Sequence, residues 1–336
     1  MYFLKNTLYS MILMAGLMVS SLIHASPIVI KFSHVVTPST PKGRGAEYFK
    51  KLVEERSKGK VKVQIYPNSQ LYKDKEELEA LQLGAVQMLA PSLSKFSPMG
   101  LTAFELFDLP YLFDNFNDLH KITNGKVGQQ LLTSLNAKGI KGLAYWDNGF
   151  KVMSANKPLL TLNDYRGKKM RIQSSRILDA QMRALGVNPQ VMAFSEVYQS
   201  LQTGVVDGTE QTPSQIYTQK FFEVQKFISL TNHGYIGYAV VVNKKFWDGL
   251  TPDIRDLLEV AMKESTEYVN KIAEQDNQES LAQIKASGRT QLVSLTPENQ
   301  LAFKKALIAI HSDQEKRVGK EVIDAVRKEL AAPTKK

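Results

Sequence analysis

Two segments hold the residues whose types and spacing best suit binding chemistry: residues 166–173 (RGKKMRIQ) and residues 203–211 (TGVVDGTEQ). The alternation in the first predicts a strand after a glycine turn, with apolar side chains on one face and Arg171 on the other. A guanidinium held on a strand can grip a carboxylate through two parallel hydrogen bonds. The second segment predicts a short strand that Asp-Gly closes, followed by the Gln211 amide. Together the segments indicate a site for a small organic anion.

The first 25 residues have the pattern of an export signal. Lys5 is the only charged residue among them, an apolar run follows, and Ala25 offers a small residue at a cleavage point. The run is short for a membrane span and lacks a basic flank. We therefore expect cleavage near Ala25 and a mature chain that lies outside the inner membrane and does not span it. An uncleaved N-terminal anchor is the alternative.

Composition excludes several classes of function. The chain has no cysteine, which rules out disulfides, thiol catalysis and cysteine-metal sites. Its formal net charge is +10, but Lys and Arg alternate with Glu, as in residues 50–56. This is the pattern of solvated helix faces, so we do not expect nucleic acid as a partner. A positive field favours the capture of an anionic solute.

No common catalytic or cofactor motif occurs. The chain contains no HExxH, GxSxG, Walker or EF-hand pattern, and Gly43-Arg44-Gly45 lacks the third glycine of a dinucleotide loop. A packing or turn role suits these glycines. We expect no catalytic residue, metal or cofactor. The four histidines after residue 25 lie far apart in the sequence. An exported hydrolase whose Ser-His-Asp triad comes together only in the folded chain remains an alternative.

The order of predicted elements favours an α/β fold. From residue 28 to residue 90 the pattern is β-α-β-α-β, which implies a parallel sheet with helices on its faces. Asn148-Gly149 predicts a turn after a strand, and a second α/β unit follows it. The apolar strand predicted from Tyr235 to Asn243 is expected to return to the first sheet.

A long helix is predicted from Thr251. Thr251-Pro252-Asp253 combines a cap, a first-turn proline and an acid, and no Pro or Gly follows until about residue 286. About 34 residues at about 1.5 Å each span roughly 50 Å, more than one domain of this size. The helix should therefore bridge two domains. Two helices with a break near residues 275–278 are the alternative.

Several further motifs follow one another along the chain: SHVV at 33–36, TPKG at 40–43, APSLSKF at 90–96, YWDNGF at 145–150 and GYIGYAV at 234–240. Together with the two opening segments, these motifs resemble those of the solute-binding subunits of TRAP transporters, of the DctP type that captures four-carbon dicarboxylates. The resemblance covers about residues 27–325.

The resemblance implies a two-lobed periplasmic binding protein with hinge strands and a long helix across both lobes. The expected lobe I comprises residues 26–148 and 237–275, lobe II comprises residues 149–236 and 276–325, and residues 326–336 form a frayed tail. It also implies delivery of the solute to TRAP membrane permease subunits, driven by an ion gradient. No catalytic step is implied. A subunit that reports its ligand to a membrane kinase is the alternative with the same fold.

The resemblance also implies site residues. Arg171 occupies the position of the family arginine that makes the main salt bridge to a ligand carboxylate; otherwise it would be a solvated side chain, as expected for Arg166 and Arg176. Gln211 stands where the family often has Asn, a departure that keeps the amide but lengthens it by one methylene. The remaining candidates are Lys42, Ser92, Lys151, Phe194, His233 and Tyr235. For each of them, an ordinary surface or core position is the alternative.

Overall fold

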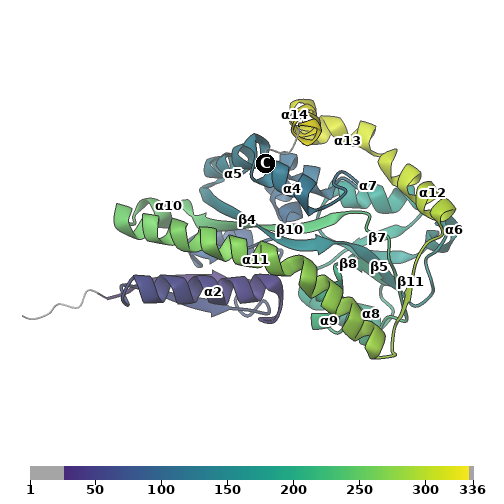
Figure 1. The fold of residues 1–336 in the computed structure, drawn as a ribbon, viewed down its shortest axis with the longest axis horizontal. Helices are drawn as coiled ribbons and strands as arrows, with labels where there is room; N and C mark the ends of the chain where they lie inside the picture. The colour runs from purple at the N-terminus through teal and green to yellow at the C-terminus, as the bar shows by residue number, and fades with distance from the viewer. Residues whose placement is uncertain (1–25, 333–336) are drawn as a thin grey trace, which may run out of the picture.

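The structure, a computed structural model, describes residues 26–332, which form two α/β lobes built around separate sheets (Figure 1). We call the part around the first sheet lobe I and the part around the second sheet lobe II. The predicted signal sequence and its cleavage point at Ala25 lie outside the described residues. No helix within 26–332 has both the length and the apolar content that crossing a bilayer requires.

The sheet of lobe I has the order β2-β1-β3-β10-β4. β1 pairs in parallel with β2 and β3, whereas β10 pairs antiparallel with β3 and β4. The return of the Tyr235–Asn243 strand to the first sheet is thus confirmed, as is the parallel β-α-β-α-β start. The elements are β1 (Ile28–Ser33), α2 (Pro41–Arg56), β2 (Val61–Tyr66), α3 (Glu77–Gln82), β3 (Met88–Leu89), β4 (Ile140–Phe150) and β10 (Tyr235–Asn243).

The sheet of lobe II has the order β11-β9-β5-β8-β6-β7. β8 lies between β5, to which it is antiparallel, and β6, to which it is parallel. The opening segments of the sequence therefore become neighbouring strands. The elements are β5 (Val152–Ala155), α6 (Leu162–Tyr165), β6 (Lys169–Ile172), α7 (Arg176–Ala184), β7 (Asn188–Val191), α8 (Val197–Gln202), β8 (Gly208–Gln211), α9 (Pro213–Thr218), β9 (Phe227–Ser229) and β11 (Gln291–Val293).

The predicted turn at Asn148-Gly149 is wrong. β4 continues through both residues to Phe150, which pairs with Tyr235 of β10. Asn148 is buried, and its side-chain Oδ1 accepts hydrogen bonds from the Thr212 and Ser214 hydroxyls at 3.0 and 2.9 Å. Because lobe II satisfies this amide, the local turn preference is overridden and the strand passes from one lobe to the other.

The Asp-Gly pair at 207–208 opens a strand instead of closing one. Asp207 Oδ2 accepts from the Lys169 N–H at 2.7 Å, and β8 starts at Gly208. A Cβ atom built on Gly208 would lie 2.0 Å from the Ser154 carbonyl oxygen of β5. Gly208 is therefore required by close strand packing. Val205, predicted to lie in a strand, is instead 57% exposed in the preceding loop.

The long helix is present as one element, α11 (Pro252–Ala286), without a break near 275–278. It packs against α2 and β4 in lobe I and against α9 in lobe II, so it bridges the lobes as predicted (Figure 1). The close packing of α2 against α11 explains why residue 45 is a glycine, because a Cβ atom on Gly45 would lie 2.2 Å from Val269 Cγ2 of α11. The packing role predicted for this segment is confirmed at Gly45.

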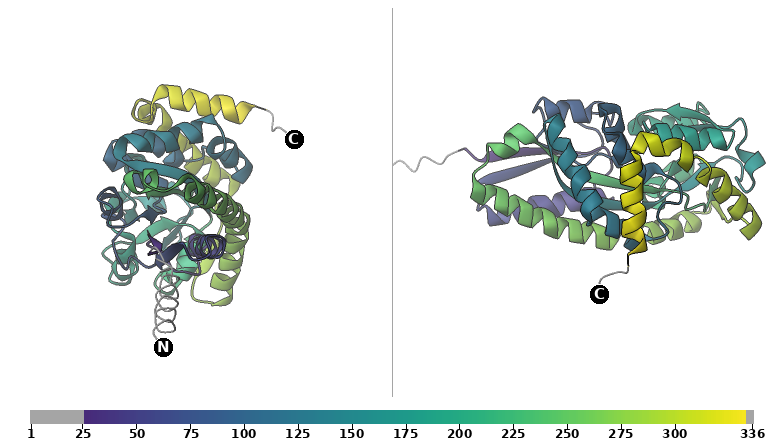
Figure 2. Two further views of the ribbon diagram at one scale, coloured as in Figure 1. Left: turned by 90° about the vertical axis from the view of Figure 1, so that its left-hand side faces the viewer. Right: turned by 90° about the horizontal axis from the view of Figure 1, so that it is seen from above.

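The C-terminal helices cross back to lobe I, which differs from two sequence predictions. α12 (Pro297–Ile308) packs on α6 and α7 of lobe II, whereas α13 (His311–Val318) and α14 (Lys320–Ala331) pack on the η2 turn (Thr102–Asp108) and on α4 (Phe116–Thr123) and α5 (Lys126–Ser134) of lobe I (Figure 2). Residues 311–325 therefore do not belong to lobe II. Residues 326–331 are helical instead of frayed, because Ile323 and Val326 are buried in the core of lobe I.

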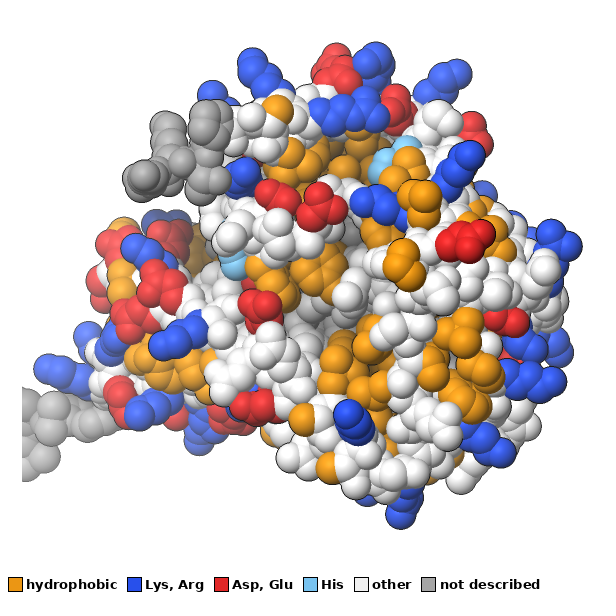
Figure 3. Space-filling view, turned by 45° about the vertical axis from the view of Figure 1, so that its right-hand side comes forward, with side chains coloured by type: hydrophobic (Ala, Val, Ile, Leu, Met, Phe, Trp, Pro, Cys, Tyr) orange, Lys and Arg blue, Asp and Glu red, His pale blue; other side chains and the backbone are white. Residues whose placement is uncertain are grey.

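The surface agrees with the charge pattern of the sequence. Lys and Arg side chains are interspersed with Asp and Glu over the visible face and form no single basic patch there (Figure 3). Arg166 and Arg176 are exposed, as expected. These observations support the solvated-face interpretation of the net charge.

Candidate ligand-binding site

A narrow cavity lies between the lobes, and the side chains around it leave a volume of about 20 Å³. Five of the eight predicted site residues line it: Lys42, Ser92, Arg171, Phe194 and Gln211. The other lining residues were not among those predicted; they are Val35, Val36, Asp74, Glu77, Lys95, Gln173, Gln215, Ile236 and Tyr238.

Arg171 lies in the middle of the lobe II wall. β6 places it between Gln190 of β7 and Thr209 of β8, and it is only 1% exposed. Its Nε and Nη2 donate to the Met192 carbonyl oxygen at 3.2 and 3.0 Å. These bonds set the plane of the guanidinium, which is the preorganisation that recognition of a carboxylate requires.

Gln211 ends β8 beside Arg171's strand and pairs with Val152 of β5. It is 1% exposed, and its Oε1 has no hydrogen-bond partner among residues 26–332. Buried polar atoms in native proteins are nearly always satisfied. An unsatisfied amide lining a cavity next to an arginine is therefore suited to a polar ligand.

Lys42 supplies a positive charge from lobe I. It lies in the first turn of α2, is 2% exposed, and its Nζ donates to the Ala90 carbonyl oxygen at 3.0 Å. The same Nζ lies 3.8 Å from the centroid of the Tyr238 ring, a cation–π arrangement. Ser92 is also on this wall, and its hydroxyl donates to Gln173 of lobe II.

Three charged lining residues escaped the sequence analysis. Lys95 Nζ pairs with Asp74 Oδ2 at 2.6 Å, and Glu77 lies 2% exposed at the start of α3. Burial raises the pKa of Glu77 to about 7 against the opposing effect of Lys42, and burial lowers the pKa of Lys42 to about 8. The signal available was the position of Lys95 within the APSLSKF motif, but nothing in the sequence pairs it with Asp74.

Comparison with known proteins assigns a family to this architecture. The family model DctP, bacterial extracellular solute-binding protein family 7, matches residues 32–317. This chain belongs to the DctP family. The C4-dicarboxylate-binding periplasmic protein DctP of Rhodobacter capsulatus is 60% identical over 303 residues, covering 90% of this chain and 91% of that protein.

Solved structures of TRAP periplasmic solute-binding proteins share the fold. The protein from Sulfurospirillum deleyianum, with bound succinate, has a TM-score of 0.87 and 46% identity, covering 90% of this chain and 99% of that chain. The protein from Pseudomonas aeruginosa, with bound L-malate, has a TM-score of 0.83 and 44% identity, covering 85% of this chain and 100% of that chain. The two-lobed fold expected for the DctP family is thus confirmed.

Lys151 and His233, two of the predicted residues, do not line the cavity of this DctP-family protein. Lys151 Nζ and His233 Nε2 each lie 2.9 Å from Glu210 Oε2, and all three side chains are buried. Burial favours the neutral carboxyl, but Lys151 and His233 outweigh this and lower the pKa of Glu210 to about 2. The charge of Lys151 is therefore compensated inside lobe II, behind the wall that carries Gln211.

His233 also makes a contact that resembles part of a hydrolytic triad, because its Nδ1 lies 2.7 Å from the Thr231 hydroxyl. However, Thr231 is 2% exposed and His233 is 0% exposed. A nucleophile that a substrate cannot reach performs no hydrolysis, so this cluster does not favour the hydrolase alternative.

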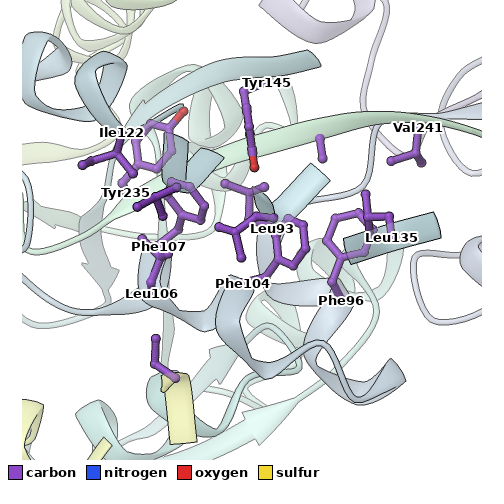
Figure 4. Close-up of a cluster of buried hydrophobic side chains, with 14 of the residues drawn as sticks. Leu93, Phe96, Phe104, Leu106, Phe107, Ile122, Leu135, Tyr145, Tyr235 and Val241 are labelled. Carbon is purple, nitrogen blue, oxygen red and sulfur yellow. The ribbon is translucent and has the colours of Figure 1, made fainter. Parts of the chain in front are cut away.

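Tyr235 is the third predicted residue that does not line the cavity. Its ring packs within the large apolar cluster of lobe I, beside Phe107 and Ile122 (Figure 4). Its hydroxyl donates to Asp147 Oδ1 at 2.6 Å, and His120 Nε2 lies 2.6 Å from Oδ2 of the same carboxylate. Tyr235 therefore anchors the strand that joins the lobes. Its neighbour Tyr238, which points to the other face of β10, is the tyrosine of the cavity.

Proposed function

We propose that this chain captures a four-carbon dicarboxylate, such as succinate, fumarate or malate, between its lobes and delivers it to the membrane permease of a TRAP transporter. The observation that carries the proposal is the placement of cations on both walls. Arg171 lies on lobe II, and Lys42 lies on lobe I, where Lys95 is paired with Asp74. Cations on opposite walls suit a ligand with a carboxylate at each end.

Each side chain has a role in this proposal. Arg171 and the Gln211 amide hold one carboxylate, and Lys42 and the Ser92 hydroxyl address the other. Phe194 packs against the carbon chain, while Lys151, His233 and Tyr235 support the walls without touching the ligand. The names of the relatives, which include dicarboxylate-binding proteins and structures with succinate and L-malate, support the same ligand class.

The magnitudes are compatible with useful affinity. Hydrogen bonds to charged groups contribute about 1.5–3 kcal/mol each, and a micromolar dissociation constant corresponds to about −8 kcal/mol. A few such bonds at each carboxylate reach this range after the costs of ordering and desolvation.

The remaining assignments follow the family. The mature chain acts in the periplasm after removal of the signal sequence near Ala25, and it performs no catalytic step. Closure is a hinge motion about β4, β10, the middle of α11 and the junction between α12 and α13, where the chain passes between the lobes. The lobe boundaries near residues 148 and 237 lie on those two strands.

Titration calorimetry against a panel of acids tests the ligand class. We expect succinate, fumarate and L-malate to bind, and butyrate, which has one carboxylate on four carbons, to bind far more weakly. Tight binding of butyrate, or of none of the dicarboxylates, would contradict the proposal. Delivery to the permease is tested by uptake of labelled succinate in cells that lack this protein and in the same cells after the protein is expressed again. Uptake that depends on the protein favours transport over sensing.

A further inference from the structure

Asp74 of lobe I makes direct contacts with lobe II at the edge of the cavity. It lies in the loop before α3, and its Oδ1 accepts a hydrogen bond from the backbone N–H of Phe194 at 3.2 Å. Its Oδ2 lies 4.0 Å from Nη2 of Arg171. A single lobe I carboxylate therefore reaches two parts of the opposite wall.

The lobe II atoms that Asp74 contacts form one unit. Arg171 donates to the carbonyl oxygen of Met192, two residues before Phe194, and its guanidinium carbon lies 5.7 Å from the centroid of the Phe194 ring. The segment that Asp74 engages is thus the segment that orients the proposed ligand-binding arginine. We propose that Asp74 is an interlobe latch, a positioning residue that holds lobe II closed over the cavity by binding the Arg171–Phe194 unit.

The charge balance of the cavity supports a specific role for this carboxylate. A negative side chain inside a site for an anion weakens anion binding through repulsion. Lys95, 2.6 Å from Asp74 on the same lobe, offsets part of that cost and holds the carboxylate in place. Burial favours a neutral Asp74, but Lys95 and Arg171 outweigh burial and lower its pKa. Asp74 thus stays ionised, which is the state that binds an N–H group and a guanidinium best.

The neighbouring contacts across the cleft are weaker candidates. Lys73 and Glu196 form an ion pair of 2.8 Å, but their side chains are 49% and 46% exposed, and exposed pairs contribute little. Glu77 shares the cavity with Asp74, yet the described residues give it no hydrogen bond or ion pair with lobe II. Glu105 of lobe I is also buried and accepts from the backbone N–H of Arg176 in lobe II at 2.8 Å, but this contact lies outside the Arg171–Phe194 unit. Asp74, with a side chain 5% exposed, is the buried carboxylate that engages that unit.

The latch predicts a conformational effect that does not depend on ligand identity. Its contacts join protein atoms, so they favour closure whether or not a solute occupies the cavity. A ligand carboxylate that reaches Arg171 then adds to a closure that Asp74 already supports, which slows release. The part of the inference that concerns release rests on the proposed function, whereas the part that concerns closure does not.

Interlobe distance tests closure directly. Because the chain has no cysteine, Leu83→Cys in lobe I and Val205→Cys in lobe II, at positions 79% and 57% exposed, would carry two spin labels. In ligand-free protein, we expect Asp74→Ala to shift the distance distribution towards longer distances. Glu77→Gln, which replaces the other carboxyl group of the same cavity, should leave the distribution unchanged at pH 8, where Glu77 is ionised. An unchanged distribution in Asp74→Ala, or an equal shift in Glu77→Gln, would overturn the latch.

Release kinetics test the second part. We expect succinate to dissociate about tenfold faster from Asp74→Ala than from the parent protein, which corresponds to about 1.4 kcal/mol, and Asp74→Asn, which keeps an acceptor oxygen, to lie between the two. Slower release from Asp74→Ala would show that repulsion by Asp74 outweighs the latch. A thermal melt verifies folding, and Asp74→Asn replaces the alanine variant if that variant unfolds. If the parent protein binds no dicarboxylate, the proposed function fails while the ligand-free distances still decide the latch.

Discussion

Lys151 Nζ lies 2.9 Å from the Glu210 carboxylate, and both side chains are at most 2% exposed. His233 and Gln181 also contact Glu210 Oε2, at 2.9 and 3.1 Å. Glu210 directly precedes Gln211 in β8, so this buried pair fixes the strand that presents the amide to the cavity. Lys151, which the sequence suggested as a charge for the ligand, is paired with Glu210 and does not line the cavity.

Removing one partner of this pair should destabilise the fold strongly. Glu210→Gln leaves Lys151 buried without a counter-charge, and breaking a buried pair from one side typically costs about 3–5 kcal/mol. Urea unfolding followed by circular dichroism measures the change. The matched control is Glu196→Gln, which breaks the exposed pair with Lys73 and should cost less than about 1 kcal/mol. Similar losses in the two variants would contradict the supporting role of Glu210.

Glu210 should also contribute to acid sensitivity. Its pKa in the folded protein is about 2, below the ordinary value of 4.5. A depressed carboxyl pKa contributes stability that is present above about pH 4.5 and lost as the pH falls towards 2. We expect the stability of the parent protein to fall more steeply over this range than that of Glu210→Gln. Parallel pH profiles for the two proteins would show that Glu210 is not responsible.

Arg171→Ala should abolish measurable dicarboxylate binding while the protein stays folded. The variant loses a bidentate, charge-assisted grip on one carboxylate, so we expect at least about a hundredfold loss of affinity, or about 3 kcal/mol. Calorimetry with succinate measures the loss. Arg166→Ala removes an exposed arginine from the same segment and should bind as the parent does. Retained affinity in Arg171→Ala would refute the assigned role.

Dicarboxylate binding should weaken as the pH rises from 6 to 9. Glu77 has a pKa of about 7, raised by burial above its ordinary 4.5, so it is neutral at pH 6 and ionised at pH 8. Lys42, with a pKa of about 8, loses its charge above that pH. Both changes make the cavity less positive. Calorimetry across this range should show the decline, and in Glu77→Gln the part between pH 6 and 8 should be absent.

The Glu77 carboxyl group should change the free energy of unfolding with pH in the opposite direction from Glu210. Because the pKa of Glu77 in the folded state lies above its unfolded value, its favourable contribution is complete below about pH 4.5 and is lost as the pH rises through 7. The stability of Glu77→Gln relative to the parent should therefore be higher at pH 8 than at pH 4.5. Urea unfolding at the two pH values measures this, and an unchanged difference would argue that Glu77 titrates normally.

Gly208→Ala should disrupt lobe II. The added Cβ would lie 2.0 Å from the Ser154 carbonyl oxygen of the neighbouring strand, and forcing atoms into a packed interior costs about 1–3 kcal/mol or more. The control is Gly204→Ala, at φ +73° with no atom within 4 Å of the new Cβ. Gly204→Ala should lower the free energy of unfolding only by the cost of placing a residue with a Cβ in the left-handed conformation, about 1–2 kcal/mol. Thermal unfolding compares them, and a smaller effect at Gly208 would contradict the packing argument.

The sequence by itself determined the elements whose signals are local. Periodicity and caps predicted the parallel start of the first sheet and the long helix from Thr251, and the strand pattern placed Arg171 on the side away from Met170 and Ile172. These features follow from neighbours along the chain, because side-chain alternation and first-turn chemistry are properties of a few consecutive residues. The family motifs then indicated an anion-binding cleft.

Only the tertiary structure decided which charges face the cavity and which neutralise one another. Lys151 and Lys42 look alike in sequence, but Glu210 pairs with one, while the other lies beside the cavity with Glu77. Asp74 and Phe194 are 120 residues apart and meet only where the two lobes face each other. Pairing of buried charges depends on distances of a few ångströms between segments remote in sequence, which no local pattern encodes.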